Sequence, residues 1–260
     1  MSTLTTNQIK MNYQITGNGE PLVFIHGLGS SGRDWEYQVD DFSRKYKVIT
    51  MDLRGHGNTE KPKGPYSMSM FAQDIAGLLI ELKEEPAHVV GLSLGGGIAF
   101  QLALDYPDLV KTLTIVNSFP ELVIRSFKDR LNAWQRFAIV KLLGMKKMGE
   151  ILSERLFPKH EHNEIRELFV QRWAENDPRA YQASMQAMIG WSVVNRLDSI
   201  KCPTLIIAAD KDYTSLDSKK EYTKLIQAAE LVVISDSRHA TPVEHPDEFN
   251  RVLIKFLDKY

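Results

Sequence analysis

The sequence contains a single cysteine, Cys202, which excludes an intramolecular disulfide and any metal site built from cysteines. Because Cys202 precedes Pro203 at the start of an apolar run, we expect a buried structural thiol there. No apolar run approaches the roughly 20 residues that a membrane-spanning helix needs, so no stable membrane association is expected. Residues 1–6 also lack a basic segment followed by an apolar one, the pattern of a signal peptide. These absences favour a cytoplasmic protein.

An excess of one charge and clustered metal ligands are lacking as well. The 32 Lys and Arg residues nearly balance the 33 Asp and Glu residues, with a formal net charge of −1, so no nucleic-acid partner is expected. The histidines are scattered without zinc-ligand spacing, and the glycine-rich loops lack the Lys-Ser or Lys-Thr pair of a phosphate-binding loop. We therefore expect no metal and no cofactor. The sequence carries no signal of an oligomeric state.

What the sequence does contain is an alternation of short apolar runs with helical patterns. Residues 9–15 alternate apolar and polar side chains, which predicts a half-exposed strand near a sheet edge. Continuous apolar runs predict buried strands at residues 22–25, 48–51, 88–92, 110–116, 204–208 and 231–234. Helical segments separate these strands, and Ser69 is expected to cap the helix over residues 71–84. The alternation predicts an α/β protein with a mostly parallel open sheet and helices on both faces.

This alternation is interrupted after Pro120. From there to Asn195 the apolar residues follow helical spacing, and no run has the character of a buried strand. The alternation resumes with the apolar run at 204–208. We therefore expect a core domain formed by residues 1–119 and 196–260, with residues 120–195 inserted as a helical cap, or lid.

The segment Gly91-Leu92-Ser93-Leu94-Gly95 lies between a predicted strand and a predicted helix. A Gly-x-Ser-x-Gly pattern in this context is typical of a nucleophile elbow, in which a sharp turn exposes the serine hydroxyl above the sheet. The helix that follows would direct unpaired backbone N–H groups toward a developing oxyanion. The alternative is a glycine-rich turn with an incidental serine, because five-residue patterns also recur by chance.

Two further kinds of polar side chain follow predicted strands, where the chemistry of open α/β sheets is usually found. Asp210 and Asp212 come after the run at 204–208, and His239 comes after the run at 231–234. A serine needs a base to take its proton, and histidine suits that task at neutral pH. A carboxylate must in turn hold the imidazole in one tautomer, and the chain order serine, acid, histidine is that expected for this type of sheet.

Over essentially its whole length the chain resembles the α/β-hydrolase fold superfamily, in its small serine esterase and enol-lactonase-like branch. The resemblance rests on five motifs, in order: His26-Gly27-Leu28-Gly29, Asp52-Leu53-Arg54-Gly55-His56-Gly57, Gly91-Leu92-Ser93-Leu94-Gly95-Gly96, Asp212, and His239 followed by Glu244-His245-Pro246. Each of them follows a predicted strand.

The resemblance implies that Ser93 is the nucleophile, His239 the base and Asp212 the acid. It favours Asp212 over Asp210 because the acid of the family usually occurs at that offset past the strand. The proline usually found beyond it is absent here. The oxyanion hole would consist of the backbone N–H groups of Leu28 and Leu94.

The remaining histidines and the motif arginine are expected to be structural. His26 would brace the loop that carries Leu28, Arg54 and His56 would belong to a turn typical of the family, and His245 would precede the last helix. We expect the other three on the surface: His88, His160 and His162.

In the proteins that the chain resembles, the inserted cap shapes the substrate pocket. The cap is rich in aromatic and methionine side chains, and the candidates for the pocket wall are Trp134, Phe137, Met188 and Trp191. Such a wall favours a small-molecule ester or lactone with an apolar part. Most aromatic and methionine side chains of the cap are expected to serve its own packing.

These observations favour a carboxylesterase-like serine hydrolase that forms an acyl-enzyme at Ser93. The first alternative is a carbon–carbon bond hydrolase of the dienoate type, although such relatives generally carry an aromatic residue where Ala240 follows His239 here. A non-catalytic ligand-binding relative is the second alternative. Epoxide hydrolases and haloalkane dehalogenases use an aspartate nucleophile, so Ser93 excludes them.

Overall fold

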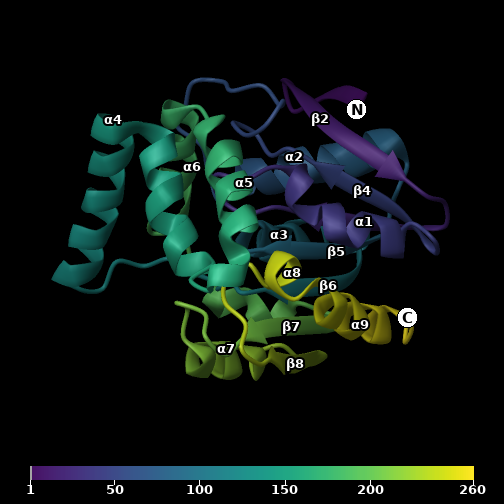
Figure 1. Cartoon of the computed structure of the whole chain (residues 1–260). Coiled ribbons are helices and arrows are strands. Elements are labelled where there is room, and N and C mark those ends of the chain that lie inside the picture. Colours follow the sequence, from purple (N-terminus) through teal and green to yellow (C-terminus); the bar gives the residue numbers. More distant parts are fainter. Residues whose placement is uncertain (1) are drawn as a thin grey trace.

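The computed structural model describes residues 2–260, which form one eight-stranded sheet in the order β1-β2-β4-β3-β5-β6-β7-β8 (Figure 1). The strands are β1 (Ser2–Thr6), β2 (Ile9–Thr16), β3 (Glu20–Ile25), β4 (Tyr46–Met51), β5 (Ala87–Leu92), β6 (Val110–Val116), β7 (Thr204–Ala209) and β8 (Ala229–Ile234). Strands β1 and β2 pair with each other, and β2 with β4, in antiparallel fashion, whereas all other pairs are parallel. The predicted mostly parallel α/β sheet is confirmed.

The half-exposed strand predicted near a sheet edge is β2, the second strand in the order. The edge strand itself, β1, is not among the predicted strands; it pairs with the outer side of β2, with Leu4 opposite Met11. Strand β1 has the sequence Ser-Thr-Leu-Thr-Thr, and most of it is exposed. It therefore lacks the apolar alternation by which a half-buried strand is recognised.

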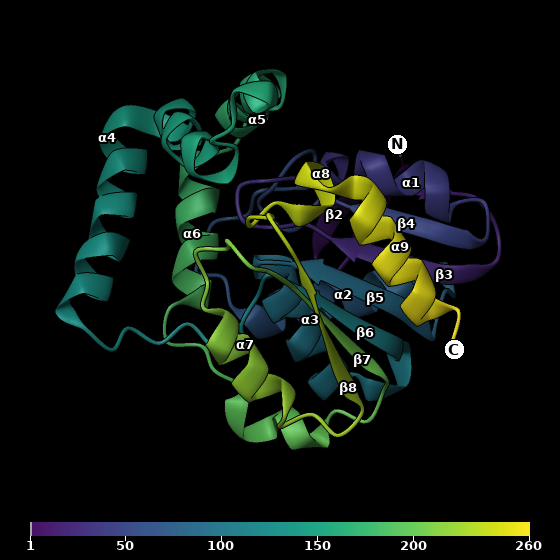
Figure 2. The same ribbon diagram turned by 60° about the horizontal axis from the view of Figure 1, so that its bottom comes forward.

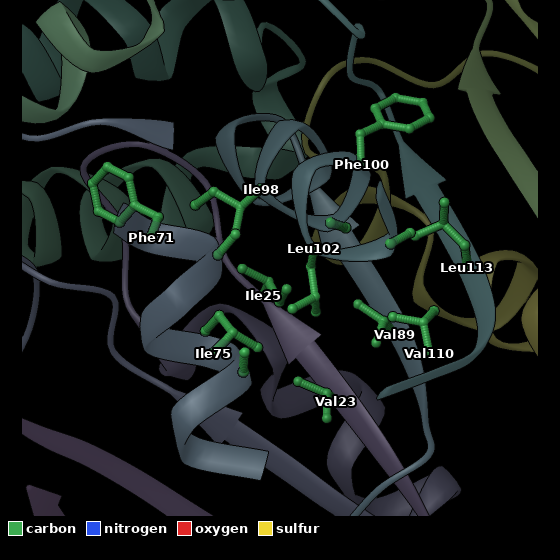
Figure 3. Packing of buried hydrophobic residues seen from close by; sticks show 14 of the residues in the cluster. Val23, Ile25, Phe71, Ile75, Val89, Ile98, Phe100, Leu102, Val110 and Leu113 are labelled. Carbon is green, nitrogen blue, oxygen red and sulfur yellow. The ribbon is translucent and has the colours of Figure 1, made fainter. Parts of the chain in front are cut away.

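Helices cover both faces of the sheet. They are α1 (Glu36–Phe42), α2 (Met68–Leu82), α3 (Leu94–Asp105), α7 (Leu216–Thr223), α8 (Thr241–Glu244) and α9 (Pro246–Leu257), with short 3-10 helices at η1 (Gly32–Trp35), η2 (Pro107–Leu109) and η4 (Val194–Ser199). Successive side chains of a strand point to opposite faces. Val23 and Val89 accordingly pack with α2 and α3 (Figure 3), whereas Phe24 packs with Trp35 and with Phe249 of α9.

Helix α2 begins one turn earlier than predicted. The Ser67 hydroxyl accepts a hydrogen bond from the Met70 N–H, and Ser67 is therefore the N-cap. Ser69, the expected cap, lies inside the first turn. The apolar residues Met68 and Phe71 lie on the buried side, so the amphipathic pattern already includes this turn.

Between β6 and β7 the chain forms three long helices beside one end of the strands (Figure 1, Figure 2). They are α4 (Phe127–Leu156), α5 (Asn163–Ala174) and α6 (Pro178–Met188), with a short 3-10 helix at η3 (His160–His162). Gly144 has a positive φ of 81° and interrupts α4 with a kink. An isolated antiparallel bridge joins Glu121 to Ser192, where the helical segment leaves the core and returns to it. None of the helices within residues 2–260 combines the length and the apolar character needed to cross a membrane.

Two of the three histidines expected on the surface are buried. His88 lies in the central strand β5, where its Nδ1 is 2.8 Å from the Thr112 hydroxyl of β6 and its Nε2 is 3.4 Å from Glu20. His162 packs edge-on against Phe157. His160 is exposed as expected. The apolar run 88–92 places His88 inside the sheet, and its two partners make that position tolerable for a polar ring.

A buried ion pair ties the loop after β4 to helix α2. Arg54 donates from Nε and Nη2 to the two oxygens of Asp74, at 2.8 and 2.6 Å, and the Asn7 amide donates to Asp74 at 2.7 Å. Both charged side chains are almost completely buried. The bidentate geometry satisfies both carboxylate oxygens, so either partner alone would be an uncompensated buried charge.

Replacement of Asp74 by alanine is therefore expected to lower the free energy of unfolding by about 3–5 kcal/mol, because Arg54 stays buried without a counter-charge. Urea denaturation followed by circular dichroism measures this change. Glu221→Ala, which removes an exposed partner of Lys224, serves as the control and should change stability by no more than about 0.5 kcal/mol. Equal losses in the two variants would contradict the assignment.

Candidate active site

Ser93 lies on the turn between β5 and α3 and has an unusual backbone conformation, with φ 55° and ψ −116°. Positive φ is unfavourable for a residue with a side chain and persists only where the surroundings enforce it. A Cβ at Gly91 would lie within 3.0 Å of the Gly95 carbonyl oxygen, and one at Gly95 within 3.0 Å of the Ile25 oxygen. Glycine is thus required at both positions, and the close contacts among β3, β5 and α3 hold Ser93 in its strained conformation.

His239 and Asp212 are hydrogen-bonded to each other. The His239 Nδ1 lies 2.9 Å from the Asp212 Oδ1, and both residues follow neighbouring strands, β8 and β7. Burial opposes ionisation of Asp212, but the hydrogen bonds and charges of His239 and Lys219 outweigh it and lower the pKa of this carboxyl to about 2. The rival Asp210 does not contact His239 but accepts a hydrogen bond from the Ser237 N–H at 3.2 Å.

Ser93 and His239 both line a cavity of about 620 Å³ between the elbow and the helices α4 and α6. Its wall is mainly apolar, and Met188 and Trp191 belong to it as expected from the sequence. The Trp191 indole donates to the Gln101 side chain at 2.7 Å, which fixes the ring against α3. Further apolar wall residues come from the core and the helical segment: Met68, Phe119, Leu122, Ile124 and Met185.

The other two expected wall residues do not line this cavity. Trp134 is 65% exposed on the outside of α4, and Phe137 packs against the hydrophobic cluster among α4, α5 and α6. The side of α4 that faces the cavity carries Asp129, Asn132, Ala133 and Arg136, which are spaced at helical i, i+3, i+4 and i+7 positions. Trp134 follows Ala133 and Phe137 follows Arg136, so both side chains are rotated around the helix, away from the side that faces the cavity.

Leu28 and Leu94 both line the cavity. Leu94 is the first residue of α3, so its N–H has no intrahelical acceptor. Within residues 2–260 neither amide donates a hydrogen bond to another group of the protein. Both remain available to an oxygen atom placed near Ser93.

His26 supports the loop that carries Leu28. Its Nε2 accepts a hydrogen bond from the Leu53 N–H at 2.9 Å, so the ring proton must be on Nδ1, which donates to the Gly27 oxygen at 2.8 Å. Burial lowers the pKa of His26 and keeps the ring neutral in this arrangement. His56 packs edge-on against His26, and burial lowers its pKa to about 3. Both rings are buried structural elements beneath the loop.

The cationic group of the cavity wall is Arg136. Its Nε donates to the Tyr181 hydroxyl at 2.6 Å, and its guanidinium lies 5.6 Å from the centre of the Tyr181 ring. Within the described residues 2–260 no carboxylate forms an ion pair with Arg136. The cavity wall therefore combines apolar side chains with the Arg136 guanidinium and with the carboxyl groups of Asp34, Glu121 and Asp129.

A model of the alpha/beta hydrolase fold family matches residues 20–246. The chain belongs to the α/β-hydrolase fold family. It is 25% identical to 3-oxoadipate enol-lactonase 2 of Acinetobacter baylyi, over 99% of this chain and 97% of that protein. Its structure is also similar to the enol-lactonase from Burkholderia xenovorans LB400, with a TM-score of 0.92, 24% identity, and coverage of 99% of this chain and 100% of that one. A thermophilic esterase from Thermogutta terrifontis, solved with malate bound, has a TM-score of 0.90 and 26% identity, with coverage of 99% and 98%.

In this member of the α/β-hydrolase family, two side chains lie next to the Asp212–His239 pair at positions that the sequence did not predict. The Tyr213 ring stacks on the His239 imidazole, with centroids 4.2 Å apart and planes inclined by 29°. The Lys219 ammonium lies 2.6 Å from the Asp212 Oδ2 and is completely buried. Lys219 and Tyr222 both lie on the buried side of α7. They are three residues apart, and this helical spacing from an aromatic residue is the sequence signal that could have indicated a buried lysine.

Cys202, expected to be a buried thiol, is half-buried between η4 and β7. Burial raises the pKa of its thiol to about 11, so the sulfur is protonated at neutral pH. A protonated thiol is a poor nucleophile, which agrees with a structural role.

The elbow glycines provide a test of the backbone constraint. Gly95→Ala is expected to lower the free energy of unfolding by at least about 3 kcal/mol, because the methyl group would overlap the rigid β3 backbone. In Gly97→Ala, the matched control in the same helix, the methyl group would meet the flexible end of Met68 at 2.9 Å and the Trp191 ring at 3.3 Å but no backbone atom, so its cost should be clearly smaller. Thermal and urea denaturation compare the two, and a Gly95→Ala protein as stable as Gly97→Ala would refute the constraint.

Proposed function

We propose that this α/β hydrolase is a serine hydrolase that cleaves a carboxylic ester or lactone with an apolar part. The observation that carries the proposal is the Asp212–His239 hydrogen bond at the edge of the cavity that also exposes Ser93 on its strained turn. A serine and an imidazole on one cavity, with a buried carboxylate bonded to the imidazole, are the components of a nucleophilic triad. Asp212 is ionised at neutral pH because its pKa is about 2, so it accepts a hydrogen bond from Nδ1–H and leaves Nε2 as the base.

In the proposed reaction, His239 Nε2 takes the Ser93 hydroxyl proton while the serine oxygen attacks the carbonyl carbon of the substrate. The amides of Leu28 and Leu94 would hold the resulting oxyanion, because both N–H groups are free and both residues line the cavity. His239 then gives the proton to the alcohol oxygen as the carbon–oxygen bond breaks. Water hydrolyses the acyl-enzyme by the same steps, with His239 again as the base, and Ser93 is regenerated.

The cavity wall supports a more specific substrate class. Arg136, whose Nε is bonded to Tyr181, supplies a guanidinium without an ion-pair partner to a wall that is mainly apolar but also carries Asp34, Glu121 and Asp129. A guanidinium binds a carboxylate through two parallel hydrogen bonds. A substrate with a carboxylate at some distance from the ester bond suits this wall. The similarity to a protein named 3-oxoadipate enol-lactonase, whose substrate is a lactone of a dicarboxylic acid, supports the same class.

Substitution of the triad provides the first functional test. Ser93→Ala, His239→Ala and Asp212→Asn are each expected to lower kcat for aryl esters by about three orders of magnitude or more, because the three side chains act as a unit. Asp210→Asn is the matched control and should retain kcat within about threefold. The measurement is the hydrolysis of aryl esters from acetyl to dodecanoyl, and the chain-length optimum also reports the depth of the apolar wall.

Hydrolysis that survives in Ser93→Ala would overturn the mechanism. A fluorophosphonate probe that labels the wild type but not Ser93→Ala separates a serine hydrolase from a non-catalytic ligand-binding relative. A wild type that is labelled but inert toward every ester would favour the alternative, carbon–carbon bond cleavage of a dienoate, which uses the same triad.

The charge of Arg136 provides a second functional test. Arg136→Gln is expected to raise KM for an aryl ester of a dicarboxylic acid by about 10- to 100-fold, because it removes a charge-assisted hydrogen bond worth about 1.5–3 kcal/mol. KM for a neutral ester of the same length should stay unchanged. Arg130→Gln, an exposed change on α4, is the control. Equal effects on charged and neutral esters would exclude carboxylate recognition by Arg136.

A further inference from the structure

Lys219 is a fully buried lysine in direct contact with the acid of the proposed triad. It lies in α7, and its side chain is 0% exposed. Its Nζ is 2.6 Å from the Asp212 Oδ2 and 3.2 Å from the Asn117 Oδ1. Burial of an ammonium group is unfavourable unless a counter-charge and hydrogen-bond acceptors surround it, and here both are present.

The two oxygens of Asp212 have separate partners. Oδ1 faces His239, whereas Oδ2 accepts hydrogen bonds from the Lys219 ammonium and the Thr214 hydroxyl. The carboxylate is thus held on one side by a cation and on the other by the imidazole. Rotation of the carboxylate would break the contact with Lys219, so this contact also orients Oδ1 toward His239.

Asn117 connects Lys219 to the backbone around His239. It follows β6 with a positive φ of 44°, and its side-chain amide donates to the His239 oxygen at 3.0 Å and to the Thr241 hydroxyl at 2.8 Å. The Asn117 Oδ1 accepts from the Ala209 N–H at 2.8 Å as well as from Lys219. Lys219 therefore belongs to a buried hydrogen-bond network that joins the ends of β6 and β7 to the histidine loop.

We propose that Lys219 is a positioning residue of the serine hydrolase proposed above, which holds Asp212 against His239 and sets the pH range in which the imidazole can act as a base. Without Lys219, a protonated His239 would face an uncompensated carboxylate in a buried site and would hold its proton more strongly. With Lys219, part of the carboxylate charge is already neutralised, and the ammonium also repels the imidazolium. Removal of the Lys219 charge is therefore expected to narrow, from the acidic side, the pH range in which the proposed base can act.

Other polar side chains also lie around the Asp212–His239 pair. They are Ser93 on the elbow, Tyr213 stacked on the imidazole, Tyr222 in α7 bonded to the Ser118 oxygen, Arg136 on α4, Asp210 bonded to Ser237, and the Arg238–Glu244 pair behind the histidine loop. Of these, Arg136 and Arg238 carry a positive charge, and Glu244 compensates the charge of Arg238.

The test is the pH dependence of kcat/KM for a neutral aryl ester in wild type, Lys219→Met and the exposed control Lys220→Met. Removal of the buried charge is expected to shift the acidic limb of the profile to higher pH by about one unit. Above that limb, Lys219→Met should retain kcat/KM within about tenfold, and Lys220→Met should follow the wild type throughout. A merely structural role would lower activity equally at every pH, and an unshifted limb in Lys219→Met would overturn the proposal.

Lys219→Gln also removes the charge but keeps an N–H donor for Asp212, so it carries the same expectation if the methionine variant does not fold. Titration of the His239 ring protons by nuclear magnetic resonance, with the signals assigned by His239→Gln, measures the effect of Lys219 on the imidazole without any catalytic turnover. It therefore tests Lys219 even if no ester is hydrolysed and the proposed function fails. A His239 titration that is identical with and without the Lys219 charge would refute the inference.

Discussion

The close backbone contact among β3, β5 and α3 is the constraint on which the rest of the site depends. Gly91 and Gly95 leave no room for a side chain, and the chain can pass from strand to helix only through the strained conformation of Ser93. The same turn places the start of α3 beside the loop after β3, so two residues with free amides line one cavity. The folding energy of the large buried sheet holds a conformation that the local sequence alone would not adopt.

Two buried ion pairs stabilise the molecule in different ways. Arg54 and Asp74 form two hydrogen bonds with each other, and this ion pair connects the loop after β4 to α2. Asp212 instead divides its two oxygens between Lys219 and His239, and the second of these partners can gain or lose a proton. Burial lowers the pKa of Lys219, whereas the charge of Asp212 raises it. A buried carboxylate with such a cationic partner can therefore act on a titratable ring without itself becoming protonated at neutral pH.

The strands, the elbow and the order of Ser93, Asp212 and His239 could be predicted because each depends on a local pattern and on the rule that parallel strands end at one edge. Strand β1 could not, because its polar residues carry no period and only its pairing with β2 makes it a strand. The helical phase of α4 decides that Arg136, and not Trp134, faces the cavity, and composition does not reveal that phase. The partner of Lys219 lies seven residues away in a different element, so only the folded chain brings the two together.

The residues of the proposed reaction follow the strands of the sheet, whereas the residues expected to select the substrate lie on the helices between β6 and β7. Ser93, Asp212 and His239 follow strands of one rigid sheet, whose hydrogen-bonded ladder limits their relative movement. The helices α4 and α6 supply most of the wall opposite, and the contact stripe on α4 can change residue by residue without disturbing the strands. Changes in that stripe alter charge and shape around the substrate while the proposed reaction stays the same. The charge of Arg136 lies on this side of α4, and substrate preference in this chain should therefore be determined by α4 rather than by the proposed triad.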